Sequence, residues 1–268
     1  MPTASTIWTE EIIPLAGTDV QIVKGGSGPP LLIFNDELGG PGWLNYHQML
    51  SDNFTLYIPS LPGYGKSVPL PWINNMRDMA GWCLQALDEL NLGKINVMGF
   101  SLGGWIASEL ATMCPHHFEK LVLVGAMGIR PTSGEILDMF MLMPDEYLAA
   151  GFVDPAGVEE FLKICPKEPS DDLDELWMQA RDHSSRLAWK PYMNNFTLPH
   201  LLNRINQLPT LIIWGAQDRV VPISAAEIYH QSIKNSRLEI FENCGHRPEI
   251  ERIDKFVNTV NNFLSGQP

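Results

Sequence analysis

The sequence predicts an α/β fold in which a mostly parallel, eight-stranded sheet carries helices on both faces. Three observations support this prediction. Short apolar runs alternate with helical patterns in the first half of the chain, similar runs return near the C-terminus, and residues 131–205 between them show no strand pattern. The 268 residues suit one large domain with an insertion. We therefore expect a core formed by residues 1–130 and 206–268, with a helical cap at 131–205.

The first elements are expected as a hairpin followed by alternating strands and a helix. Apolar stretches at 7–13 and 20–23 flank the Gly17-Thr18-Asp19 turn, which indicates an antiparallel edge. Parallel strands are expected at 31–34, 55–58 and 95–98. A helix is expected near 75–90, because its apolar residues recur at three- and four-residue steps, and Asn91 and Gly93 end it.

The later elements continue the same pattern. Continuous apolar runs at 121–124, 210–214 and 238–241 are typical of strands that are covered on both faces. Ser224 and Glu227 have the spacing of a capping box at a helix start. An amphipathic helix should end the chain, with apolar residues at positions 256, 260, 263 and 264.

Composition and charge exclude several classes of function. The net charge of -13 repels phosphate backbones and anionic lipid. No run approaches the roughly 18 apolar residues that span a bilayer. Four widely spaced cysteines show no Cys-x-x-Cys pair, which favours reduced thiols. We expect a cytoplasmic protein with a small-molecule substrate and without a nucleic-acid or membrane partner, and we leave a homodimer open.

The candidate nucleophile is Ser101. It lies in Gly99-Phe100-Ser101-Leu102-Gly103-Gly104, between the strand at 95–98 and a helical segment at 105–113. A sharp strand-to-helix turn crowds the residues around its serine, so the positions two before and two after it must lack side-chain bulk. The pattern predicts a nucleophile elbow.

A serine hydroxyl needs a histidine base that is oriented by a carboxylate. Asp218 follows the strand at 210–214, and His246 follows the last strand, 28 residues later. The chain order Ser, Asp, His therefore predicts Asp218 as the acid and His246 as the base. Their alternative roles are an Asx turn for Asp218 and an ordinary loop hydrogen bond for His246. The histidines show no metal-ligand spacing.

These residues resemble the α/β-hydrolase superfamily across essentially the whole chain. The resemblance is carried by residues 99–104, by Gly-Ala-Gln-Asp-Arg-Val-Val-Pro at 215–222 and by Gly-His-Arg-Pro at 245–248. It implies the α/β-hydrolase fold and serine chemistry with neither a cofactor nor a metal ion. The fold hosts many reactions, so the substrate stays open.

The expected oxyanion loop departs from the family pattern. Such hydrolases usually carry His-Gly after the third strand, where this chain has Asn35-Asp36-Glu37. One oxyanion donor should be the backbone N–H of Leu102, and the resemblance implies that the second comes from Glu37 or Leu38. We expect Asp36 and Glu37 to face solvent and cap the following helix. Pointing inward, they would oppose a developing negative charge.

A second resemblance concerns the glycine-rich segment at 39–46, which is similar to a loop of meta-cleavage product hydrolases. Those enzymes cleave carbon–carbon bonds with the same triad. In the cap, Arg186 and Trp189 have the chemistry to contact a substrate carboxylate or ring, but an amphipathic packed helix is the simpler interpretation.

The leading hypothesis is a serine hydrolase in which Ser101, His246 and Asp218 hydrolyse an ester or related carbonyl compound. The Met-rich cap suggests a substrate of small to medium apolar character, although methionine is equally ordinary in a core. Two alternatives stay open: a carbon–carbon bond hydrolase of the meta-cleavage type, and a catalytically weak ligand-binding member of the fold.

Overall fold

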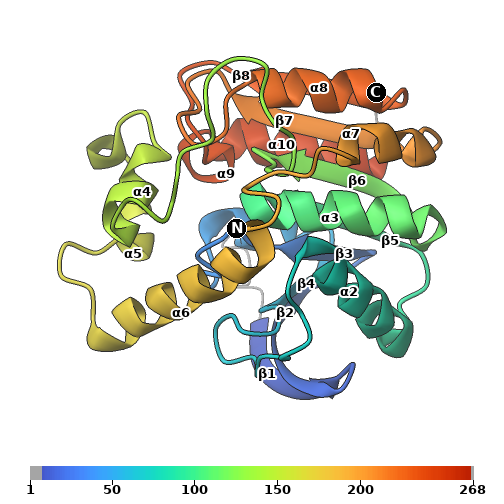
Figure 1. The fold of residues 1–268 in the computed structure, drawn as a ribbon, viewed down its shortest axis with the longest axis horizontal. Coiled ribbons are helices and arrows are strands. Elements are labelled where there is room, and N and C mark those ends of the chain that lie inside the picture. Colours follow the sequence, from blue (N-terminus) through green and yellow to red (C-terminus); the bar gives the residue numbers. More distant parts are fainter. Residues whose placement is uncertain (1–7, 267–268) are drawn as a thin grey trace, which may run out of the picture.

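The computed structural model describes residues 8–266, which form a central sheet between two layers of helices (Figure 1). The expected strand at 7–13 begins at residue 7, which lies outside the described residues. Eight strands make up the sheet: β1 (Trp8–Leu15), β2 (Thr18–Gly26), β3 (Pro30–Phe34), β4 (Thr55–Pro59), β5 (Ile95–Phe100), β6 (Phe118–Val124), β7 (Thr210–Gly215) and β8 (Ser236–Phe241).

The strand order is β1-β2-β4-β3-β5-β6-β7-β8. The β1–β2 and β2–β4 pairs are antiparallel, and all later pairs are parallel. This confirms the predicted antiparallel edge and mostly parallel sheet. The carboxyl ends of β5, β7 and β8 therefore meet along one edge of the sheet, where ligands bind in open α/β sheets.

Ten helices are described: α1 (Asn45–Leu50), α2 (Met76–Leu90), α3 (Ser101–Met113), α4 (Pro144–Ala150), α5 (Phe161–Ile164), α6 (Asp171–Ala188), α7 (Leu198–Leu201), α8 (Ser224–Ser232), α9 (Pro248–Glu251) and α10 (Ile253–Ser265). Short 3-10 turns lie at Pro115–His117, Pro155–Gly157 and Leu202–Ile205.

Each face of the sheet has its own apolar core. In β3, Leu32 and Phe34 join the cluster under α2, α3 and α8, whereas Leu31 and Ile33 join the cluster under α1 and α10. All four side chains are at most 3% exposed. Because successive residues of a strand point to opposite faces, a strand covered on both sides must be apolar throughout. The continuous apolar runs were therefore a sound signal for central strands.

The inserted segment, residues 131–205, contains helices α4 to α7 and no strand within the described residues. Helices α4, α5 and α6 lie to one side of the sheet (Figure 1). This agrees with the expected helical content, whereas the division into core and cap domains stays a prediction. Within residues 8–266, no helix combines the length and apolar character needed to cross a membrane.

Two local predictions are wrong. Strand β8 is an edge strand in which only Phe241 is buried, because among residues 8–266 no further strand pairs with its outer side. The predicted capping box is absent: helix α8 begins at Ser224, whose hydroxyl instead donates to the carbonyl of Ser133 at 2.9 Å. The Ser224 side chain therefore forms a tertiary hydrogen bond and does not cap the helix.

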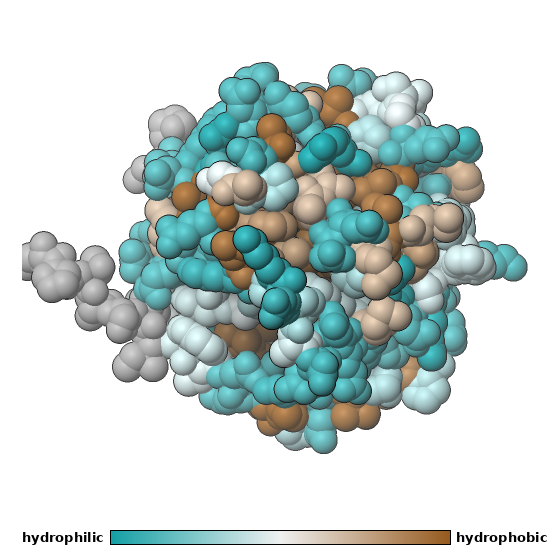
Figure 2. Space-filling model, turned by 90° about the vertical axis from the view of Figure 1, so that its left-hand side faces the viewer, coloured by the Kyte–Doolittle hydropathy of each residue, from teal (hydrophilic) through white to brown (hydrophobic). Residues whose placement is uncertain are grey.

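The methionines of the inserted segment divide between core and surface. Met139 and Met193 are buried, whereas Met141, Met143 and Met178 are between 54% and 80% exposed. On the face of the molecule that includes the inserted segment, hydrophobic residues gather between hydrophilic ones (Figure 2). Because three of these five side chains point to solvent, their composition does not by itself support an apolar substrate pocket.

Substitution of Gly103 by alanine should destabilise the fold, because a Cβ there would lie 2.2 Å from the Asn35 carbonyl oxygen. Overpacking of this kind typically costs about 1–3 kcal/mol. The matched control is Gly81→Ala in α2, where nothing lies within 4 Å of the new Cβ, and a gain of roughly 0.5–1 kcal/mol is expected. Denaturant unfolding of both variants checks this. Equal stability of the two would contradict the close packing of α3 on the β3 loop.

Candidate active site

Ser101 occupies a strained turn between β5 and α3. Its φ is 48°, in the left-handed region that non-glycine residues rarely adopt. The turn is possible because neighbouring positions lack side chains: a Cβ on Gly99 would lie 2.3 Å from the Gly103 carbonyl oxygen, and one on Gly104 would lie 2.6 Å from the Ala126 Cβ. The geometry is that of the predicted nucleophile elbow, with the helix beginning at the serine itself.

Asp218 and His246 meet as the chain order predicts. An Asp218 carboxylate oxygen lies 2.8 Å from His246 Nδ1, and both side chains are almost completely buried. The other carboxylate oxygen accepts hydrogen bonds from the backbone N–H groups of Val220 and Val221. Asp218 therefore forms the Asx-type turn of the alternative interpretation and also orients the imidazole. With Nδ1 donating to Asp218, Nε2 is left as the basic nitrogen.

The backbone of His246 is hydrogen-bonded to the inserted segment. The His246 N–H donates to the Gly151 carbonyl at 2.7 Å. On the other side of the imidazole lies Gly125, directly after β6, where a Cβ would be only 2.8 Å from His246 Cε1. Sequence reasoning missed Gly125, although a glycine directly after a buried strand is a detectable signal for a close approach.

The surroundings of His246 favour its protonated form. Burial alone would lower the pKa of the imidazole, but the charge of Asp218, the hydrogen bond to it and the charge of Glu37 raise this pKa above its ordinary 6.5. Arg247 opposes them more weakly. A histidine base of this kind readily holds the proton that it takes from a serine.

The Ser101 hydroxyl is buried and has no hydrogen-bond partner among the described residues; the residue is 1% exposed. A buried hydroxyl without a partner is free to rotate toward a base or toward a substrate. Catalytic hydrogen bonds are often absent before substrate binds.

The oxyanion loop differs from the expectation. Glu37 and Asp36 are 2% and 7% exposed, so the prediction that they face solvent and cap a helix is wrong. An Asp36 carboxylate oxygen accepts the Leu38 N–H at 2.9 Å. A Glu37 carboxylate oxygen accepts the Leu102 N–H at 3.3 Å. Of the three residues expected to supply oxyanion donors, Leu102 and Leu38 thus already donate their backbone N–H groups to carboxylates of this loop. Their roles as donors to a substrate stay predictions.

Partners outside the loop explain why these carboxylates point inward. Asp36 forms an ion pair with Arg247, which lies 3.5 Å from a carboxylate oxygen of Glu249. Burial raises the pKa of Glu249 to about 7, although the charge of Arg247 lowers it. Glu37 accepts a hydrogen bond from the Tyr147 hydroxyl of α4. Sequence reasoning missed Arg247, Glu249 and Tyr147, because their contacts join segments far apart in the chain.

The contacts of Arg186 and Trp189 are to neighbours in the inserted segment. Arg186 is half exposed and pairs with Asp182 one helical turn earlier. Trp189 is 63% exposed and packs edge-on against Phe140 and Tyr192. Both observations agree with the expectation that these residues serve the helix rather than a substrate.

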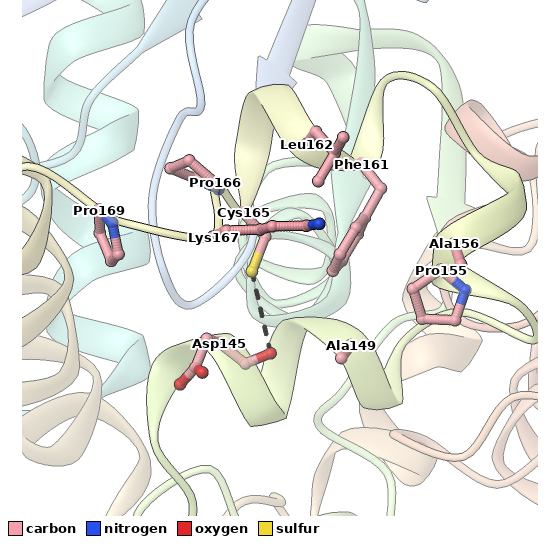
Figure 3. A pocket seen from close by; sticks show the side chains of 10 residues that line it. All are labelled: Asp145, Ala149, Pro155, Ala156, Phe161, Leu162, Cys165, Pro166, Lys167 and Pro169. Atoms are coloured by element: carbon pink, nitrogen blue, oxygen red, sulfur yellow. Dashed lines mark hydrogen bonds between the residues drawn. The ribbon is translucent and has the colours of Figure 1, made fainter.

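Two cavities adjoin the inserted segment. One of about 230 Å³ lies beside the site and is lined by Asp36, Leu38, Trp177 and Arg247, among others. The other, about 460 Å³, is lined by residues of α4, α5 and their flanking loops (Figure 3). In it, Cys165 Sγ points to the backbone oxygen of Asp145. The second cavity is separate from the site, because neither the three triad candidates nor Asp36, Leu38 and Arg247 line it.

The rate of Ser101 acylation should rise with pH, with a midpoint above 6.5, because His246 acts as a base only when it is neutral and its pKa is raised. In Asp218→Asn the midpoint should fall and the plateau rate should drop by roughly 10⁴-fold. Exposed Asp254→Asn in α10 is the control, with an unchanged profile. Stopped-flow or discontinuous assays of acylation against pH check this. A midpoint that is the same in the wild type and Asp218→Asn would contradict the pairing.

Comparisons with known proteins identify relatives along almost the whole chain. A hydrolase of Pseudomonas putida named 2-hydroxy-6-oxononadienedioate/2-hydroxy-6-oxononatrienedioate hydrolase 1 is 29% identical, over 93% of this chain and 89% of its own. A hydrolase of Cupriavidus pinatubonensis with the same substrates in its name is 28% identical, over 94% and 88%.

Solved structures show the same fold. The 2-hydroxy-6-oxo-6-phenylhexa-2,4-dienoate hydrolase of Rhodococcus sp. strain RHA1 superposes with a TM-score of 0.76 at 19% identity, covering 97% of this chain and 99% of that one. A thermophilic esterase gives 0.75 at 22% identity, covering 97% and 98%. The profile of the Alpha/beta hydrolase family matches residues 35–259. The chain therefore belongs to the alpha/beta hydrolase family.

Proposed function

We propose that this enzyme hydrolyses an ester or related carbonyl compound through a covalent acyl-Ser101 intermediate. The observation that carries the proposal is the buried pair of Asp218 and His246 at 2.8 Å, placed at the same sheet edge as the strained Ser101 turn. A buried carboxylate–imidazole pair next to such a serine is the arrangement that activates a hydroxyl.

The proposed reaction has two halves. In the first, Ser101 Oγ attacks the carbonyl carbon while its proton passes to His246 Nε2, and the carbonyl electrons move onto oxygen. Collapse of this tetrahedral species expels the alcohol, which takes the proton from His246. In the second half, His246 removes a proton from water, which attacks the acyl carbon, and Ser101 leaves with that proton. Asp218 orients the imidazole and stabilises its charged form throughout.

A second candidate function is hydrolysis of a carbon–carbon bond in a vinylogous diketone. The names of the Pseudomonas and Cupriavidus relatives support it. The same nucleophile and base would serve, but the leaving group is a carbon that must be protonated. Turnover of a dienoate without turnover of simple esters would favour this candidate over the first.

A fluorophosphonate probe should label the wild type at Ser101, because covalent capture requires an activated serine but no knowledge of the substrate. Labelling should vanish in Ser101→Ala and fall by roughly 10³-fold or more in His246→Ala. The matched control is Ser108→Ala, which removes another buried hydroxyl of α3 that donates to the Gly104 carbonyl.

Peptide mapping by mass spectrometry identifies the labelled residue. Labelling that persists in Ser101→Ala, or a wild type that is never labelled and turns over neither esters nor dienoates, would refute the proposal. The second result, combined with ligand-induced thermal stabilisation, would favour the ligand-binding alternative.

A further inference from the structure

The Glu37 side chain lies where a hydrolase needs to hold the oxyanion of its reaction. The N–H of Leu102 belongs to the residue after the nucleophile, and such an N–H is the donor that stabilises the tetrahedral intermediate. Here it donates to a Glu37 carboxylate oxygen at 3.3 Å. A carboxylate oxygen resembles the substrate oxyanion in charge and size. The site therefore contains an occupant supplied by the chain itself.

A second contact holds that carboxylate from the inserted segment. Its other oxygen accepts a hydrogen bond from the Tyr147 hydroxyl of α4. Burial, followed by the charge of Glu37, raises the pKa of Tyr147 well above its ordinary 10, so the phenol keeps its proton and donates it. Both Tyr147 and Glu37 are at most 3% exposed.

The backbone of Glu37 is tied to the same segment. Its carbonyl accepts a hydrogen bond from the Ser184 hydroxyl of α6 at 2.8 Å, and Ser184 also lies 2.8 Å from the Tyr64 hydroxyl. Ser184 is fully buried. Two helices of the inserted segment therefore fix Glu37, one through its carboxylate and the other through its backbone.

We propose that Glu37 is an internal ligand of the oxyanion site, which a substrate carbonyl must displace before Ser101 can react. The inference rests on the proposed function, since it assigns a partner to the same Leu102 N–H. With Glu37 in place, a tetrahedral intermediate would lack this donor and would meet a second negative charge. Glu37 then selects for substrates that bind strongly enough elsewhere in the site to expel it.

Space for the displaced side chain exists nearby. The cavity of about 230 Å³ is lined by Leu38, next to Glu37 in the chain, and by Arg247. Burial lowers the pKa of the Arg247 guanidinium, but the charges of Asp36, Glu249 and, less strongly, Glu37 raise it above its ordinary value. A carboxylate that leaves Leu102 therefore meets a cation at the edge of a cavity.

The test measures the rate of fluorophosphonate labelling of Ser101 in the wild type and in Glu37→Ala. Removal of the internal ligand should accelerate labelling by about 10- to 100-fold, the range expected for releasing one hydrogen bond to a charged group. Tyr147→Phe, which removes the other anchor, should accelerate it less. Glu37→Gln keeps the side-chain shape and replaces Glu37→Ala in the test if the alanine variant unfolds. Its labelling rate should lie between those of the wild type and Glu37→Ala.

The effect of sodium acetate on the labelling rate distinguishes an internal ligand from a purely structural role of Glu37, because a structural role predicts no effect. In Glu37→Ala, acetate should refill the vacated position and slow labelling, with sodium chloride at equal concentration as the reference. The wild type should not respond, because its own carboxylate already holds Leu102. Glu109→Gln is the matched control, since Glu109 is a fully buried carboxylate of α3 that contacts Trp105 and Asn195 instead. Its labelling rate should stay within about twofold of the wild type, as for a site with no shared partner.

The outcomes separate this inference from the proposed function. Equal or slower labelling of folded Glu37→Ala, or no response of that variant to acetate, would overturn the internal-ligand role while leaving Ser101 as the nucleophile. Absence of Ser101 labelling in both the wild type and Glu37→Ala would overturn the proposed function, and this inference with it. Thermal unfolding of each variant establishes that the compared proteins are folded.

Discussion

The strained turn at Ser101 is the constraint on which the rest of the site depends. A serine at a φ of 48° costs on the order of 1–3 kcal/mol, and the surrounding close packing has to hold it there. Gly103 supplies that packing by lying against the backbone after β3. The same turn starts α3 at Ser101, so the Leu102 N–H lies in the first turn of that helix. The proposed nucleophile and the proposed oxyanion donor therefore both depend on this one turn.

Buried charge is the second constraint at this edge. Asp218, Asp36 and Glu37 carry carboxylates into the interior, where Arg247 pairs with Asp36 and His246, when protonated, pairs with Asp218. Buried carboxylates persist when donors satisfy them, and each of the three has such a partner. The arrangement favours the charged imidazole that forms during serine attack. It also places a negative charge where the reaction generates another, so the resting site is not yet complementary to its transition state.

The sequence predicts the strands and the Asp218–His246 pair, because strands give a local apolar signal and the pair follows the order of the strands. Continuous apolar runs mark strands covered on both faces, and the order of Ser101, Asp218 and His246 follows the order of strands along the chain. The direction of Glu37 was mispredicted, because it is set by Tyr147, a residue 110 positions away. The capping-box prediction was wrong for the same reason, because the Ser224 hydroxyl donates to the distant Ser133 carbonyl and does not cap its own helix.

A crystal structure of the enzyme with phenylboronic acid would show most directly whether reaction at Ser101 displaces Glu37 from the Leu102 N–H. Boron forms a tetrahedral adduct that resembles the intermediate. The expected structure has a covalent bond from Ser101 Oγ to boron, a boronate oxygen within hydrogen-bond distance of the Leu102 N–H, and a Glu37 carboxylate moved away from that donor. An adduct in which Glu37 still accepts the Leu102 N–H, or a boronate bound away from Ser101, would contradict it.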